Sequence, residues 1–141
     1  MGPEDLSRLH AACFTTPRPW SAAEFADFLA QDGVFLVQEP GGFLLGRVIV
    51  DEAELLTLAV DPAQRRRGIA RRLMAQFVAQ CQTRNVCSAF LEVSETNAAA
   101  RALYVATGWQ ESGRRRAYYR TPEGVPQDAV VMGLPLGSAA G

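Results

Sequence analysis

The apolar residues of this chain recur at two spacings, one typical of helices and one typical of strands. A repeat close to 3.6 residues predicts a helix with one buried face, and short apolar runs between turn residues predict strands. The helical spacing covers residues 4–14, 21–30, 69–81 and 97–107, and the strand pattern covers residues 33–39, 42–50, 54–60, 88–94, 109–119 and 128–136. Hairpins followed by helical crossovers predict an α/β protein (α+β in some schemes). We expect a mixed sheet with helices on both faces.

Local signals place the ends of several predicted elements. Ser21 followed by Glu24 forms a capping box, and Asn97 supplies an N-cap. Gly108 with the apolar Trp109 after it ends the last helix. The run 54–60 is almost wholly apolar, so we expect a central strand that is buried on both faces.

Length and composition indicate one folded domain. The chain has 141 residues, of which 48% are hydrophobic and 21% are charged, and these values are ordinary for a globular protein. We expect a single domain at 1–136 and a disordered tail at 137–141. The sequence shows neither a signal-peptide pattern nor an apolar run of about 18 residues, which predicts a cytoplasmic protein without membrane contact. One histidine and three cysteines match no zinc spacing, so no metal is expected.

Arginines crowd the start of the helix predicted at 69–81, in the segment DPAQRRRGIARRL (61–73). Cations are disfavoured there, because the free N–H groups of a helix N-terminus make it positive. An anion would bind those N–H groups and the guanidinium groups together, and Gly68 and the small Ala70 would let it approach the backbone. A solvated basic surface is the alternative. It accounts for the arginines but leaves Gly68 and Ala70 unexplained.

The overall charge restricts what such a site can bind. The formal net charge is −1, so any basic site is local. All 14 basic residues are arginine, and this excludes the lysine of a P-loop.

The pattern Arg65-x-x-Gly68-x-Ala70 resembles the pyrophosphate loop of the GNAT acyltransferase superfamily. Further segments are similar to the bacterial ribosomal-protein-alanine N-acetyltransferases, namely PWS (19–21), DEAELLTLAVDP (51–62), LEVSETNAAARALYVATGW (91–109) and RRRAYY (114–119). The likeness covers nearly the whole chain. It implies the GNAT fold with a splayed central strand pair, acetyl-CoA as donor and a protein N-terminal amine as acceptor. The expected acceptor is the N-terminal Ala of a small-subunit ribosomal protein, and the expected state is a monomer or weak dimer.

The resemblance also implies which residues hold acetyl-CoA. The pantetheine arm would lie along the strand before the arginines, where the backbone of Leu58, Ala59 and Val60 would bind it. Asn97 would cap its helix and touch the cofactor. The pyrophosphate would be held by backbone amides of the loop and the following turn, those of Arg66, Arg67, Gly68, Ile69, Ala70 and Arg71.

Glu92 and Tyr104 are the candidates for acid–base chemistry. An α-amino group has a pKa of about 8, so it needs a base before it can attack a thioester at neutral pH. Glu92 lies in the apolar strand FLEVS (90–94), where it is either a base or a half-solvated strand residue. Tyr104 is either a core aromatic or the acid that protonates the leaving thiolate. The resemblance favours the catalytic reading of both, with Glu92 acting through a water.

Two further pairs of residues carry weaker interpretations. Tyr118 and Tyr119 would line the peptide groove, or they are ordinary strand aromatics. His10 and Cys13 share a helix face as a conceivable Cys–His pair, although packing is the simpler reading.

Two departures from the family pattern stand out. The chain begins almost at its first helix, so the usual first edge strand is short or absent. Ala117 replaces a polar residue that many relatives carry before the two tyrosines, which leaves the fine substrate selectivity open.

Two other functions remain open at this stage. A small-molecule amine or polyamine acetyltransferase of the same fold is one, because the acidic residues Asp51, Glu52 and Glu54 cluster. A non-catalytic module that binds nucleic acid through the arginines is the other. The slightly negative net charge and the absence of aromatics within the arginine run argue against direct nucleic-acid binding.

Overall fold

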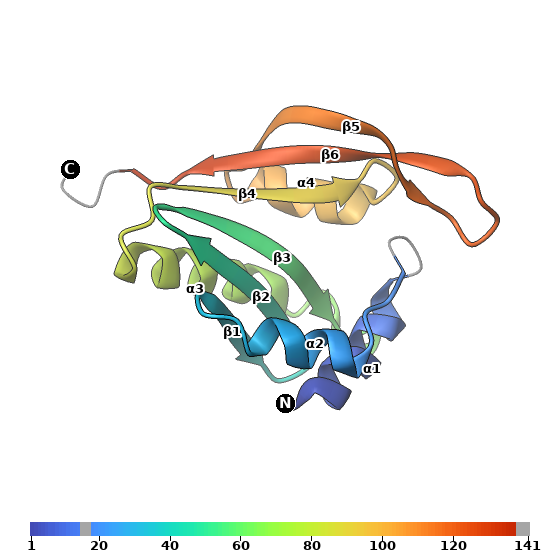
Figure 1. Cartoon of the computed structure of the whole chain (residues 1–141), viewed down its shortest axis with the longest axis horizontal. Coiled ribbons are helices and arrows are strands. Elements are labelled where there is room, and N and C mark those ends of the chain that lie inside the picture. The colour runs from blue at the N-terminus through green and yellow to red at the C-terminus, as the bar shows by residue number, and fades with distance from the viewer. Residues whose placement is uncertain (15–17, 138–141) are drawn as a thin grey trace.

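Six strands form one sheet in the part of the chain that the structure, a computed structural model, describes: residues 1–14 and 18–137 (Figure 1). The spatial order of the strands is β1-β2-β3-β4-β6-β5. The strands are β1 (Val34–Glu39), β2 (Gly42–Ile49), β3 (Glu52–Val60), β4 (Ser88–Ser94), β5 (Gln110–Arg120) and β6 (Pro126–Pro135). The helices are α1 (Pro3–Cys13), α2 (Ala22–Leu29), α3 (Ile69–Thr83) and α4 (Ala98–Ala106), with a short 3₁₀ turn, η1, at Pro62–Gln64.

This order of helices and strands confirms the predicted one. The sequence predicted the last strand at 128–136, which leaves Pro126 in the loop before it, and that is wrong: Pro126 begins β6. A proline is tolerated at the first residue of a strand, where its missing N–H interrupts no ladder. Residues 138–141 of the predicted tail and residues 15–17 of the predicted break after the first helix lie outside the described residues.

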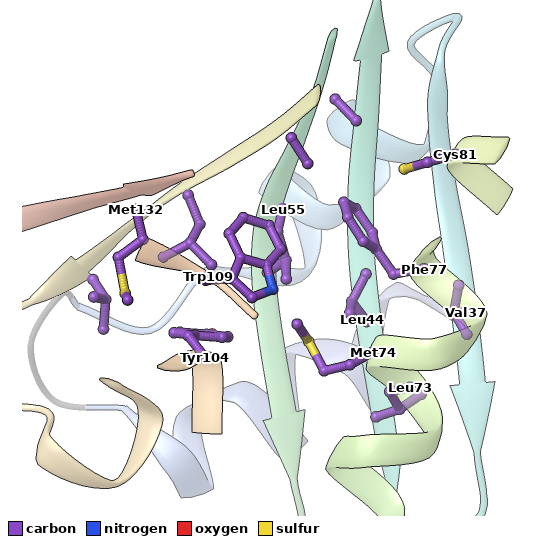
Figure 2. Packing of buried hydrophobic residues seen from close by; sticks show 14 of the residues in the cluster. Val37, Leu44, Leu55, Leu73, Met74, Phe77, Cys81, Tyr104, Trp109 and Met132 are labelled. Carbon is purple, nitrogen blue, oxygen red and sulfur yellow. The ribbon is translucent and has the colours of Figure 1, made fainter. Parts of the chain in front are cut away.

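The helices cover both faces of the sheet, as expected. On one face, α3 and α4 pack around Trp109, whose ring lies 6.1 Å from Phe77 of α3 and 6.0 Å from Tyr104 of α4, measured between ring centroids (Figure 2). On the other face, α1 and α2 bury Leu6 and Phe25 against β2 and β3. Burying these large apolar side chains supplies the main driving force for the layered arrangement.

The two central strands pair only at one end. β3 and β4 run parallel, and their register extends from Glu52↔Ser88 to Glu54↔Phe90 and then stops. Both strands continue beyond that point, so their facing edges diverge (Figure 1). This is the splayed central pair that the resemblance implied. No strand precedes α1 in the described residues, which agrees with the expected loss of the first edge strand.

A β-bulge interrupts β3 where the strands separate. Leu45 of β2 pairs with Thr57, and the next residue, Gly46, pairs with Leu55. Leu56 therefore has no partner in the ladder with β2, and the bulge changes which side chains face each layer. The prediction that β3 is buried on both faces is wrong, because alternate residues from Glu54 to Val60 are only half-buried. Those residues line the cavities described below.

Candidate active site

Two adjoining cavities lie where β3 and β4 diverge. One has a volume of about 380 Å³ and the other about 570 Å³. Four residues contribute to the walls of both: Phe14, Leu58, Asn97 and Ala100. These shared walls place the two cavities side by side between the splayed strands. The larger cavity leads to the arginine loop, and the smaller one leads to Glu92 and the tyrosines.

The arginine loop forms one end of the larger cavity. Arg65, Arg66, Gly68, Ala70 and Arg71 line it, together with Ile69, the first residue of α3. Gly68 is the N-cap of α3 and has a φ of 76°, a left-handed conformation that glycine adopts without strain. Arg66 is also left-handed, at φ 67°. A turn of this kind at a helix N-terminus presents successive backbone N–H groups to an anion.

The arginines of this segment divide into two groups. Arg72 points away from the cavity, since its guanidinium pairs with Glu39 of β1 and donates to the carbonyl oxygen of Arg67 at 3.0 Å. Arg67 is absent from the cavity wall as well. Arg65, Arg66 and Arg71 therefore provide the positive charge at the cavity, while Arg72 fastens the start of α3 to the sheet.

The last residues of β3 form the inner wall. Leu58, Ala59 and Val60 line the larger cavity, and the ladder with β4 has already ended at Glu54. The β4-facing edge of this part of β3 is thus free to pair with an extended ligand. The Cys13 thiol donates to the carbonyl oxygen of Val60 at 3.2 Å, which holds α1 against this edge.

Asn97 stands between the two cavities. Its side chain accepts a hydrogen bond from the Ala100 N–H at 3.2 Å and so caps α4, as the sequence predicted. Asn97 also borders both cavities, so its cap places the N-terminus of α4 where the two cavities meet.

Glu92 projects from β4 into the smaller cavity. Its carboxylate Oε1 lies 2.8 Å from Nε of Arg115 on β5, and the side chain of Glu92 is only 16% exposed. A carboxylate at this depth, held by one ion pair and open to a cavity, has the position that a general base requires.

Tyr104 lines the same cavity from α4 and is 6% exposed. Burial, and to a smaller degree the neighbouring Tyr119, raises its pKa well above the ordinary value for tyrosine. The phenol therefore stays protonated at neutral pH. Sequence reasoning offered Tyr104 as either a core aromatic or an acid, and the side chain is positioned for both, since its ring packs near Trp109.

Tyr118 and Tyr119 reach the cavity because β5 bulges beside them. Arg115 pairs with Ala129 of β6 while Tyr119 pairs with Gln127, so β5 accommodates two extra residues. Burial, followed by the negative charges of Glu92 and other neighbours, raises the pKa of Tyr119 to about 12. Its hydroxyl is therefore a donor at neutral pH.

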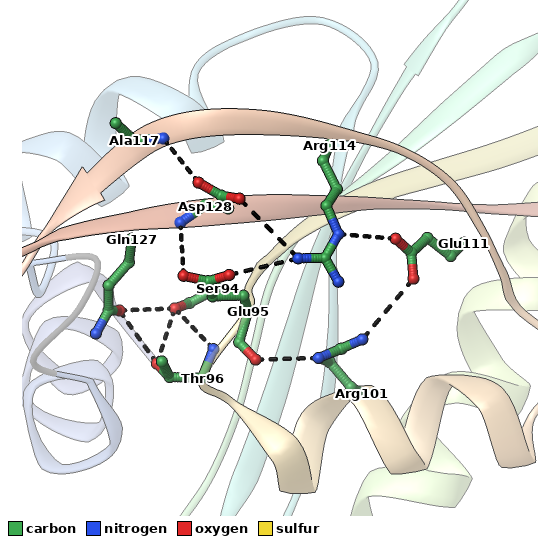
Figure 3. Close-up of polar contacts among 9 residues, drawn as sticks. All are labelled: Ser94, Glu95, Thr96, Arg101, Glu111, Arg114, Ala117, Gln127 and Asp128. Atoms are coloured by element: carbon green, nitrogen blue, oxygen red, sulfur yellow. Dashed lines mark hydrogen bonds and ion pairs between the residues drawn. The ribbon is translucent and has the colours of Figure 1, made fainter.

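A polar network holds this bulge in place (Figure 3). Ala117 has a φ of 50°, which is unfavourable for a residue with a Cβ, and its N–H donates to Asp128 Oδ1 at 2.9 Å. Arg114 lies 4.0 Å from the other oxygen of Asp128 and also pairs with Glu95 and Glu111. The network connects the turn after β4 to β5, so it fixes the tyrosines relative to Glu92.

Comparison with known proteins shows the family of this chain. The family model described as acetyltransferase (GNAT) family matches residues 4–109. The chain belongs to the GNAT acetyltransferase family. The expectation of an acetyl-CoA-dependent N-acetyltransferase is confirmed at the level of the family.

Individual relatives agree with this family membership. The chain is 38% identical over 122 residues to the [ribosomal protein bS18]-alanine N-acetyltransferase of Escherichia coli strain K12, which covers 84% of this chain and 82% of that protein. It is 44% identical over 94 residues to the protein of that name from Salmonella typhimurium, covering 67% of this chain and 63% of the relative. The crystal structure of the ribosomal-protein-S18-alanine N-acetyltransferase from Escherichia coli superposes with a TM-score of 0.83 at 33% identity, covering 94% of this chain and 86% of that one.

In this GNAT chain, His10 proves to be a structural residue that sequence reasoning had left open. It is 1% exposed, its Nδ1 accepts from the Trp20 N–H at 3.1 Å, and its Nε2 lies 3.0 Å from the Thr57 hydroxyl. Burial lowers the pKa of His10 to about 4, so the ring is neutral and Nε2 carries the proton. The Cys–His pair does not form, because Cys13 bonds to Val60 instead. His10 joins α1, β3 and the segment before α2 beside the smaller cavity.

The structure adds an ion pair to the cavity wall that the sequence did not predict. Arg47 Nη2 on β2 donates to Glu54 Oε1 on β3 at 2.7 Å, and both residues line the smaller cavity. The two residues pair directly across the antiparallel ladder, a relationship that only the hairpin register reveals. Of the acidic cluster that suggested a polyamine site, Glu54 alone reaches the cavity wall.

Among the described residues, no group of three or more His, Cys, Asp or Glu side chains is arranged to hold a metal ion. In the same residues, no helix is both long enough and apolar enough to cross a membrane.

Proposed function

We propose that this protein transfers the acetyl group of acetyl-CoA to a protein N-terminal amine, specifically the N-terminal Ala of a small-subunit ribosomal protein. The observation that carries the proposal is the pair of adjoining cavities between the splayed strands. The arginine loop lines one of them, and a carboxylate and a phenol line the other. The names of the bacterial relatives support the choice of acceptor.

The donor fits the larger cavity. The pyrophosphate of acetyl-CoA would sit on the N–H groups from Arg66 to Arg71, between the guanidinium groups that face the cavity. The pantetheine arm would follow the free edge of β3 at Leu58, Ala59 and Val60 as an added strand. Its thioester would then reach the junction at Asn97, where the two cavities meet.

The acceptor amine would enter the smaller cavity in its charged form. Glu92, through a water, would take one proton, and the neutral amine nitrogen would attack the thioester carbonyl carbon. Leu56, whose backbone the bulge frees from the β2 ladder, is our candidate donor to the oxyanion. The C–S bond then breaks with its electron pair leaving on sulfur, and Tyr104 protonates the thiolate. The amide nitrogen loses its second proton, which restores the phenol through solvent.

A panel of acceptors tests this proposal. Short peptides that differ only in their first residue would be incubated with acetyl-CoA alongside spermine, and release of free CoA would be measured. We expect acetylation of the Ala peptide at a higher kcat/KM than peptides with a bulky first residue. Acetylation of spermine with no peptide acetylated would overturn the proposal. A matched peptide with a blocked N-terminus controls for hydrolysis of acetyl-CoA.

A polyamine acceptor is the second candidate, because Glu54 and Glu92 both line the acceptor cavity. Asp51 and Glu52, the other members of the acidic cluster, do not contribute to that wall. A polyamine site with several carboxylates is therefore less well supported than a peptide groove bordered by Tyr118 and Tyr119.

A further inference from the structure

The geometry points to Glu54 as a specificity residue: we propose that it selects acceptor peptides with a basic side chain at the second or third position. This inference rests on the proposed peptide acetylation and adds a sequence preference to it. It concerns a part of the cavity wall that the reaction steps above do not use.

Glu54 lies where the two central strands, β3 and β4, begin to diverge. It pairs with Phe90, the last residue of β4 in the parallel ladder, and Glu92 follows two residues later on the same face of β4. From the usual strand spacing and rise, the two carboxylate-bearing positions are on the order of 8 Å apart. A peptide amine at Glu92 would therefore place its second or third residue within side-chain reach of Glu54, given about 3.5 Å of chain per residue.

Glu54 has acceptor capacity left for a cation. The charged residues on the cavity wall are Arg47, Glu54 and Glu92, and Arg115, outside the wall, pairs with Glu92. Arg47 occupies one oxygen of Glu54 and leaves further lone pairs of that carboxylate for a ligand. The side chain of Glu54 is 22% exposed, so a bound guanidinium or ammonium group would be partly shielded from water.

Arg47 holds the Glu54 carboxylate in place and is not itself available to bind an acidic side chain of the peptide. Its Nε is buried without a hydrogen-bond partner among the described residues, and its Nη2 is committed to Glu54. This half-buried ion pair holds the Glu54 carboxylate in place. An acidic peptide side chain would have to displace Glu54 to reach Arg47, so basic residues are the preferred class.

Peptide pairs test the inference. We would measure kcat/KM for peptides that begin with Ala and carry Arg, Gln or Glu at the second or third position. For the wild-type protein we expect Arg to exceed Gln by about tenfold or more at one of these positions, as a charge-assisted hydrogen bond would give. In the variant Glu54→Gln, the ratio of kcat/KM for the Arg peptide to kcat/KM for the Gln peptide should fall toward unity.

Two further variants serve as controls for stability and for position. Arg47→Gln combined with Glu54→Gln removes both charges, so that no arginine is left unpaired if the single variant is unstable. Glu52→Gln, on the same strand but outside the cavity wall, should keep the wild-type preference. Equal kcat/KM for Arg and Gln peptides in the wild type, or an unchanged ratio in Glu54→Gln, would overturn the inference. If no peptide were acetylated, the proposed function itself would fail.

Discussion

Glu92 Oε1 and Arg115 Nε lie 2.8 Å apart, although the strands that carry them are separated by β6. Arg115 is 59% exposed and Glu92 only 16%, so the pair reaches from solvent into the acceptor cavity. Because Arg115 does not line the cavity, it is able to orient the carboxylate without touching an acceptor. This makes Arg115 a positioning residue for the proposed base.

Arg115→Gln should lower kcat several-fold with little change in KM, because the carboxylate loses its fixed orientation. Glu92→Gln should lower kcat by about 10²- to 10⁴-fold, and its residual rate should rise with pH up to about 8, where the acceptor amine deprotonates unaided. In the Glu92→Gln background the Arg115 substitution should have no further effect. Steady-state kinetics of the four proteins measure this cycle. Full additivity of the two effects would exclude the positioning role.

Tyr104→Phe should lower kcat by about 10²-fold and leave the dissociation constant of acetyl-CoA nearly unchanged. The pKa of Tyr104 is raised by burial, so the phenol remains protonated across the whole assay range. We therefore expect no loss of wild-type rate between pH 7 and 9 from ionisation of this group. Tyr118→Phe, at a 52% exposed position, is the matched control. An unchanged kcat in Tyr104→Phe would remove the residue from the mechanism.

Gly68→Ala should weaken acetyl-CoA binding by at least about tenfold. A Cβ at this φ of 76° is strained by about 1 kcal/mol, and it would lie 3.3 Å from Arg72 Nη1 at the edge of the anion loop. Gly124→Ala controls for strain, since its φ of 85° is similar and its Cβ would meet open space. Isothermal titration with acetyl-CoA should separate the two variants, whereas thermal melts should show similar losses. Equal affinities would argue against a pyrophosphate at this loop.

His10 should make the fold sensitive to mild acid. The folded state holds the His10 pKa at about 4, below the ordinary histidine value of about 6.5, so between these values the unfolded state binds more protons. Stability is therefore fully present above pH 6.5 and falls by about 3 kcal/mol as the pH drops to 4. Urea unfolding across this range should show the loss in the wild type. In His10→Gln, the free energy of unfolding should depend on pH only through the carboxyl groups. An identical pH dependence in both proteins would contradict the assignment of this loss to His10.

The parts of the fold that depend on local sequence could be predicted. Asn97 and Ser21 cap their helices as expected, and Gly68 stands directly before α3, where the sequence placed the start of that helix. Each of these features depends on residues within one turn of the chain. The splayed central pair followed from the family resemblance, since nothing in the composition of β3 or β4 reveals that their ladder ends at Glu54.

The features that the sequence did not reveal depend on strand register. The bulge at Leu56 and the bulge beside Ala117 arise because paired strands contribute unequal numbers of residues. The pairing of Arg47 with Glu54 requires the same knowledge, since the two residues meet across a hairpin. Packing was the simpler interpretation of His10 from the sequence and is confirmed, but its bonds to Thr57 and Trp20 depend on the tertiary fold.

The position of the transferred acetyl group tests the central claim most directly. A peptide that begins with Ala and contains an internal lysine would be incubated with acetyl-CoA and then sequenced by tandem mass spectrometry. We predict a single acetyl group on the α-amine and none on the lysine, with the product strongly reduced for Glu92→Gln. Acetylation of the lysine alone, or a peptide left unmodified while acetyl-CoA is bound, would contradict the proposed function.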